Sequence, residues 1–274
     1  MPGFALHVDS CTKVFDHLKL RKQSFKFALV TIGSVISDLE EVHVLKNVHW
    51  RAEEFLKYLL KHDPKYAPLA VGMILHEELD KMIDKHFVNQ RICEAHDLLH
   101  TYNLDAERVD DAAHYLIDHT VNCNALEREP GIILLAEKSK KRLSAKHIAK
   151  IAHHLTSFFG GDEKEVIHAM FTFRDFNMAQ YLSADEAAAV YGKFMFLKQE
   201  LKQKPVGLLG KLKLGLKYTS FLLDNRKHII KEMSRDAKKR FSNHDRAYAK
   251  ACKALVKKIV KVSAQYRILR HAKA

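Results

Sequence analysis

The amino-acid sequence predicts an all-α protein built as a bundle of many helices. Its 274 residues include only 10 Gly and 5 Pro, which is too few for the many turns of an all-β fold. Apolar residues recur at helical spacing along much of the chain. Hydrophobic residues make up 47% of the total, enough for a sizeable core in a chain of this length. We therefore expect long helices packed around a buried core.

In the first half of the chain, apolar patterns and end signals mark each predicted helix. Residues 25–36 (FKFALVTIGSVI) are almost wholly apolar and predict a buried helix that frays at Gly33 and delivers Asp38 at its end. The next apolar pattern ends before Pro64, and Pro68 opens the helix that follows. The predicted helices cover residues 4–19, 25–36, 50–60, 69–89 and 90–103.

Caps and breaks divide the second half in the same way. The dipeptides Pro130-Gly131 and Gly160-Gly161 interrupt the apolar patterns and indicate helix ends. Ser and Asp precede the next patterns, as expected of N-caps. The predicted helix starts are Asp105, Ser144, Asp162, Ser183 and Asp224.

The charge is concentrated at one end of the chain. Residues 226–274 hold 16 Lys or Arg and 3 Asp or Glu, a net charge of +13, which equals the net charge of the whole chain. We therefore divide the sequence into a neutral helical domain, 1–225, which also holds the candidate metal site, and a basic C-terminal helical extension, 226–274. The extension carries a heptad seam of Tyr248, Cys252, Leu255, Ile259, Val262, Tyr266 and Leu269. This seam either docks on the chain's own core, which we favour, or pairs with another helix.

The cysteines and the hydropathy pattern indicate a cytoplasmic protein. The four Cys residues, at 11, 93, 123 and 252, show no metal-ligand spacing, and no signal peptide is evident at the N-terminus. We therefore expect them to be reduced thiols. No run of apolar residues approaches the length of a membrane span.

His76 and Asp80 form the central candidate for a metal site. On a helix the two residues are i and i+4, so both side chains project from one face, where an imidazole and a carboxylate can share a divalent ion. The same pattern recurs at His49/Glu53, His114/Asp118 and His228/Glu232. His76 and His114 follow apolar residues and are expected on buried faces, where a carboxylate needs a cation or a strong donor. A hydrogen-bonded core pair is the alternative for any single match.

Read in order, several motifs resemble the zinc-dependent phospholipase C/P1 nuclease superfamily, in its intracellular prokaryotic branch. The opening MPGFALH resembles M-P-x-x-x-x-H, and GSVISD resembles G-x-x-x-x-D. His49-Trp50 stands before a Phe-Leu helix, and His114/Asp118 takes the place of H-x-x-x-E. The strongest match is G-x-x-x-H-x-x-x-D-x-x-x-x-x-H, at Gly72, His76, Asp80 and His86. The resemblance covers about residues 1–120, and it is fainter near 191–215.

The resemblance implies a helical bundle with one to three zinc ions and phosphoester hydrolysis by metal-activated water. One ion would be held by Asp38, His49, His76 and Asp80. A second would use His86, His114 and Asp118. A third would share Asp80 with His7. Asp38 would act as a ligand or as a base for the nucleophile, and a Zn²⁺ ion would lower the pKa of its water toward ~7. The substrate class stays open.

Two other interpretations remain open. The segment around His76 also resembles HD-domain phosphohydrolases, in which His49 would be the upstream His and Asp118 the distant Asp, while Asp80 and His86 would have no role. The other alternative is a non-enzymatic helical scaffold whose residues 226–274 bind an acidic partner, either an anionic membrane surface or nucleic acid. Neither oligomeric state nor substrate follows from the sequence.

Overall fold

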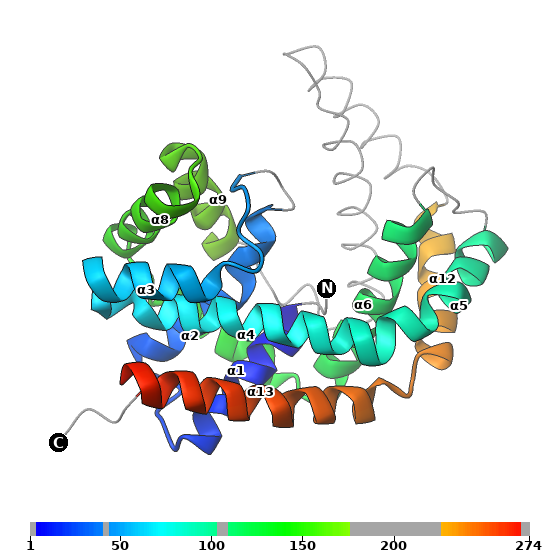
Figure 1. The fold of residues 1–274 in the computed structure, drawn as a ribbon. Helices are drawn as coiled ribbons and strands as arrows, with labels where there is room; N and C mark the ends of the chain where they lie inside the picture. Colours follow the sequence, from blue (N-terminus) through cyan, green and yellow to red (C-terminus); the bar gives the residue numbers. More distant parts are fainter. Residues whose placement is uncertain (1–3, 41–43, 103–108, 176–225, 270–274) are drawn as a thin grey trace, which may run out of the picture.

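The computed structural model describes residues 4–40, 44–102, 109–175 and 226–269, and all the elements described are helical. Figure 1 shows the arrangement, with α4 and α2 crossing at the centre and the other helices around them. The prediction of an all-α bundle is thus confirmed. Among the described residues, no helix combines the length and apolarity needed to cross a membrane. All four cysteines are free.

The helix bounds follow the predicted pattern closely. The predicted starts at Asp105, Ser183 and Asp224 lie outside the described residues. In chain order the elements are α1 (Phe4–His17), α2 (Phe25–Ile36), the 3₁₀ turn η1 (Ser37–Glu40), α3 (Ala52–His62), the 3₁₀ turn η2 (Pro64–Tyr66), α4 (Ala67–Ile83), the π turn η3 (Asp84–Val88), α5 (Asn89–Thr101), α6 (Val109–Arg128), α7 (Gly131–Lys141), α8 (Ala145–Phe159), α9 (Glu163–Asp175), α12 (Arg226–Arg240) and α13 (His244–Tyr266).

Two glycines, Gly33 on α2 and Gly72 on α4, allow these helices to cross at close range. A Cβ atom on Gly33 would lie 2.0 Å from the carbonyl oxygen of Leu69, and one on Gly72 would lie 2.1 Å from that of Val30. The two backbones can approach this closely only because both residues are glycine. The expected fraying at Gly33 is therefore wrong. Gly33 is an interior helix residue, and it serves close packing rather than a helix end.

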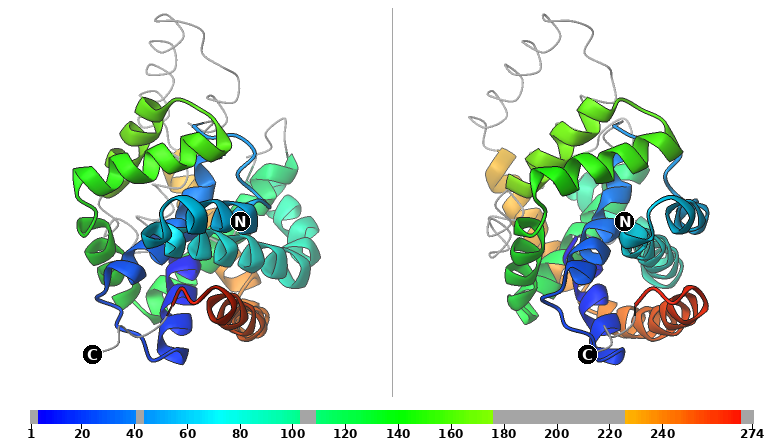
Figure 2. Two further views of the ribbon diagram at one scale, coloured as in Figure 1. Left: turned by 60° about the vertical axis from the view of Figure 1, so that its left-hand side comes forward. Right: turned by 90° about the vertical axis from the view of Figure 1, so that its left-hand side faces the viewer.

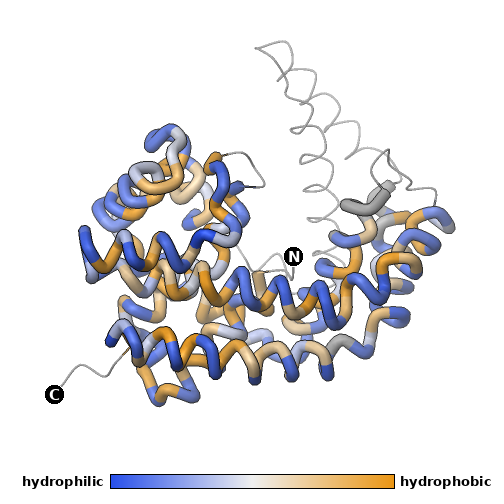
Figure 3. Tube along the Cα trace, in the orientation of Figure 1, coloured by the Kyte–Doolittle hydropathy of each residue, from blue (hydrophilic) through white to orange (hydrophobic). Residues whose placement is uncertain are grey.

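Helix α13 packs along α4 and against α1 (Figures 1 and 2). The seven residues of the predicted heptad seam, six on α13 and Leu269 just after it, are buried, except for the half-buried Tyr266. The tube coloured by hydropathy shows blue and orange alternating along this helix (Figure 3). The seam thus docks on the chain's own core, as favoured above. The opposite face is exposed and holds Arg246, Lys250, Lys253, Lys257 and Lys261.

Candidate metal centre

The candidate ligands come from separate elements that meet around the middle of α4. His7 lies on α1, Asp38 on η1, and His76 and Asp80 on α4. His49 stands just before α3. His76 is fully buried and Asp80 nearly so. The Gly33–Gly72 contact lies one turn before His76, and it draws the end of α2 close enough for η1 to reach the same point.

Five predicted ligands converge on this point. His76 Nε2 lies 3.1 Å from Asp80 Oδ2 and 3.6 Å from Asp38 Oδ1. On the other side, His7 Nε2 lies 3.3 Å from Asp80 Oδ1, and the rings of His7 and His76 stack at 4.3 Å. Ligand atoms of His7, His76 and Asp80 lie within 4.8 Å of one another, and so do those of Asp38, His49 and His76. We call these five residues the metal cluster.

Two imidazoles of the metal cluster are held by bonds directed away from it. His76 donates Nδ1–H to the carbonyl oxygen of Ser34 at 2.9 Å. His49 is held by Glu40, whose carboxylate lies 2.8 Å from Nδ1 and also accepts the backbone N–H of His49 at 2.9 Å. With Nδ1 protonated and bound outward, each neutral ring presents the Nε2 lone pair to the cluster. Outward bonds of this kind orient histidine ligands at metal sites.

Several inward atoms stand at ion-pair distance from a neighbour but make no well-aligned hydrogen bond. Within the described part of the chain, Nε2 of His49, Nε2 of His76 and Oδ1 of Asp80 are buried and make no hydrogen bond. The same holds for Oδ1 of Asp38. Buried polar atoms are normally satisfied, so this converging set of imidazole nitrogens and carboxylate oxygens is one that a cation could share. Imidazole nitrogen and carboxylate oxygen are ligands that Zn²⁺ accepts in tetrahedral sites.

Strong coupling between the charges agrees with this geometry. Burial alone would lower the pKa of His76, but Asp80 and Asp38 outweigh it and raise that pKa to about 9. Burial would raise the pKa of Asp80, but His76 and His7 lower it to about 2. Burial, together with the nearby Asp80 carboxylate, raises the pKa of Asp38 despite His76. Without an ion, the cluster therefore holds protons in place of a cation.

The second predicted ligand set is brought together only in part. His114 Nε2 lies 3.2 Å from Asp118 Oδ2 and 3.5 Å from Asp84 Oδ1. His86 lies elsewhere, in a small groove that it lines with Lys250 and Ala251 of α13. His86 lies within the π turn η3, so its side chain does not follow the α-helical direction of Asp80 and Asp84. The structure thus places Asp84 beside His114 where the resemblance implies His86.

Two residues near the site were given no ligand set by the sequence patterns. Glu40 lies nine positions before His49, and no motif spacing joins them, so the sequence gives no signal for its role. Asp84 follows Asp80 by four residues, a spacing that is compatible both with a further ligand and with an exposed partner for Lys81 or Lys85. Oδ1 of Asp84 is buried and makes no hydrogen bond among the described residues.

Exposure indicates where the metal cluster opens. The Asp38 side chain is 40% exposed and that of His49 22%, and His114 and Asp84 are also partly exposed. His7 and His76 are fully buried. The metal cluster is therefore open to solvent on the side of Asp38, with His7 and His76 behind it.

Comparisons with protein-family models, curated proteins and solved structures found no match to this chain. The resemblance to the phospholipase C/P1 nuclease superfamily therefore stands on the motifs quoted above.

Proposed function

We propose that the protein is a metal-dependent phosphoester hydrolase of the phospholipase C/P1 nuclease type. The observation that carries this proposal is the meeting of two overlapping groups of ligand atoms that share His76. Asp38, His49 and His76 form one group, and His7, His76 and Asp80 form the other, with the ligand atoms of each group within 4.8 Å of one another. Asp38, His49 and His76 with Oδ2 of Asp80 would hold one ion, and His7 with Oδ1 of Asp80 would hold a neighbouring one. The donor set suits Zn²⁺.

The bound ions would supply a water of lowered pKa and positive charge for the phosphoryl oxygens. The protein's own residues would hold the metal ligands and the attacking water in position. Ser34 and Glu40 fix the two imidazoles, so that Nε2 of each is aimed before substrate arrives. Asp38 is the most exposed member of the metal cluster, so it is the carboxylate nearest an incoming phosphoester and the residue we assign to orient the attacking water and accept its proton.

The geometry favours this proposal over the HD-type alternative. An HD site has no role for Asp80, yet Asp80 lies between His7 and His76 and within ion-pair distance of both. Asp118, which the HD reading would place with His76, is paired instead with His114.

Elemental analysis of protein purified without added metal tests the proposal. We expect one to three Zn²⁺ per chain in the wild type and loss of at least one in Asp80→Asn. Glu232→Gln is a matched control, because His228 and Glu232 form the same i, i+4 pair at 3.2 Å on an exposed helix face. Folded wild type that binds no divalent ion, and that does not hydrolyse bis(p-nitrophenyl) phosphate when zinc is supplied, would overturn it.

A further pair of variants identifies the second ligand set. We expect Asp84→Asn to lower the metal content, because Asp84 Oδ1 lies 3.5 Å from His114 Nε2. His86→Gln should leave the metal content unchanged, because His86 lines the groove beside α13. The reverse result would restore the assignment implied by the resemblance.

The exposed face of α13 supports a second candidate function, binding of a polyanion. Five cations stand along this face, spaced three or four residues apart: Arg246, Lys250, Lys253, Lys257 and Lys261. Lys and Arg in such a row can hold nucleic acid or an anionic membrane surface. Binding of duplex DNA or of phosphatidylserine vesicles that weakens steeply between 50 and 200 mM salt would support it. Binding that does not depend on salt would contradict it.

A further inference from the structure

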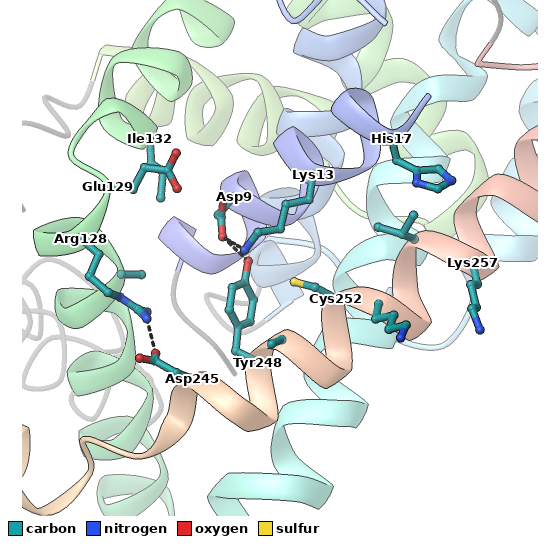
Figure 4. Close-up of a pocket in the computed structure, with 14 residues that line it drawn as sticks. Asp9, Lys13, His17, Arg128, Glu129, Ile132, Asp245, Tyr248, Cys252 and Lys257 are labelled. Atoms are coloured by element: carbon teal, nitrogen blue, oxygen red, sulfur yellow. Dashed lines mark hydrogen bonds and ion pairs between the residues drawn. The ribbon is translucent and has the colours of Figure 1, made fainter. Parts of the chain in front are cut away.

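A groove of about 800 Å³ lies between α1 and α13 (Figure 4). Asp9, Lys13 and His17 line one wall at four-residue spacing. His7 lies two residues before Asp9, a rotation of about 200° on a helix, so it faces the cluster instead. Along the other wall, α13 lines the groove from Asp245 to Lys257, a length of about 18 Å.

A polar network that includes the buried Tyr248 and Asp9 joins α13 to α1. Tyr248 of α13 donates its hydroxyl to Asp9 Oδ2 on α1 at 2.6 Å, and the same carboxylate oxygen pairs with Lys13 at 2.5 Å. Figure 4 shows Tyr248 reaching across to these two residues. At one end, Arg128 pairs with Asp245. The two walls are thus tied together by specific bonds, and the groove is built into the fold.

Positive charge without an acidic partner lies at the other end of the groove, near Lys257. The carboxylates of Asp9 and Asp245 are already paired, as described, and the third carboxylate of the lining, Glu129, lies beside Ile132 at the Arg128 end (Figure 4). In the part of the chain that the structure describes, neither Lys253 nor Lys257 pairs with a carboxylate, and both side chains are exposed. His17 lies across the groove from Lys257 and offers a further nitrogen (Figure 4).

Between the two charged ends the lining is largely apolar. Ala249, Cys252 and Val256 line it from α13, and Ala125 and Ile132 line it from α6 and α7. Pockets that bind small molecules usually combine an apolar lining with a few polar groups that fix orientation, and their volumes fall between about 300 and 1,000 Å³. An apolar strip with a cationic end is complementary to a long apolar body with one anionic head.

We propose that this groove binds an elongated amphipathic anion, with its acidic head on Lys253, Lys257 and His17 and its apolar chain lying along α13 toward Ile132. The head can be a phosphate or a carboxylate. The proposal goes beyond the proposed hydrolase function, because none of its residues belongs to the metal cluster.

Isothermal titration calorimetry of the full chain with dodecyl phosphate, below its micellar concentration and in EDTA, tests the proposal. EDTA prevents the head group from binding to a metal ion. We expect one molecule per chain and at least tenfold weaker binding of inorganic phosphate and of dodecyl maltoside, which lack the chain and the charge respectively. Asp80→Asn should bind as the wild type does, so failure of the metal centre leaves this result unchanged.

Two variants place the ligand in the groove. Ala249→Trp should fill the groove and abolish binding, and the double variant Lys253→Gln/Lys257→Gln should weaken it at least tenfold. Lys250→Gln/Lys261→Gln is the matched control on the same helix, and it should change affinity less than twofold. The proposal is overturned if dodecyl phosphate does not bind, if Ala249→Trp, shown by circular dichroism to be folded, binds normally, or if both double variants weaken binding equally. Equal affinity for dodecyl maltoside or inorganic phosphate would also overturn it.

Discussion

Substitution of Gly33 by alanine should destabilise the protein, although alanine is the better helix former. In an exposed helix the exchange would stabilise by up to about 1 kcal/mol. Here the new Cβ would lie 2.0 Å from the Leu69 carbonyl oxygen and 2.9 Å from its carbon, and these backbone atoms cannot rotate away. To reach ordinary contact, α2 and α4 must separate by roughly 1.5 Å. Overpacking of this kind costs about 1–3 kcal/mol and occasionally more, so we expect a net loss of about 2 kcal/mol.

Urea unfolding followed by circular dichroism measures this loss, and metal content measures its effect on the site. Separation of the helices would also move the Ser34 carbonyl from His76, so metal affinity should fall together with stability. Gly131→Ala is the control, because a Cβ there has nothing within 4 Å; its stability should be unchanged or slightly raised. Gly33→Ala protein as stable as the wild type would show that α2 and α4 do not cross as described.

Two further predictions concern hydrogen bonds that hold side chains in place. Glu40→Gln should weaken metal affinity about 10–100-fold, which is the usual effect of losing an outer partner of a histidine ligand. Chelator competition measures the affinity, and substitution of the exposed Glu54 by Gln is the control. An unchanged affinity would mean that Glu40 does not orient His49. Burial first, and then Cys252 and Asp9, raise the pKa of Tyr248 well above 10, so the folded state keeps the phenol neutral after the unfolded chain has ionised. Stability from this group is therefore complete below pH 10 and falls above it by at most about 1.4 kcal/mol per pH unit. Urea unfolding between pH 8 and 11 should show this slope in the wild type and a shallower one in Tyr248→Phe; equal slopes would refute the assignment.

The sequence predicts the helices well where their ends are marked by local chemistry. Residues 25–36 and the helix after Ser144 were predicted with their observed bounds, because Ser24 and Ser144 each cap a first turn and apolar periodicity defines the rest. The role of Gly33 could not be predicted in this way. A glycine inside a helical pattern suggests a weak point of the helix unless the residue that packs against it on the next helix is known.

The candidate site was predictable where ligands share a helix and less so where they do not. His76 and Asp80 follow from i, i+4 spacing alone. His7, Asp38 and His49 were placed by resemblance, and the structure brings all three to the same point. His86 and Asp84 were harder, because the π turn that starts at Asp84 changes the direction of the side chains that follow it, and apolar periodicity carries no sign of such a turn. Glu40 acts on His49 through tertiary structure only.

The outward bonds of His49 and His76 also bear on the proposed metal, because they affect when an ion would enter the protein. Small zinc-dependent modules gain their fold from the ion and are disordered without it. Here Ser34 and Glu40 hold both imidazoles in place, and the scaffold is a large apolar interior that requires no ion. We expect the chain to reach its native shape before loading, so that its occupancy follows the supply of metal in its surroundings and can change without unfolding.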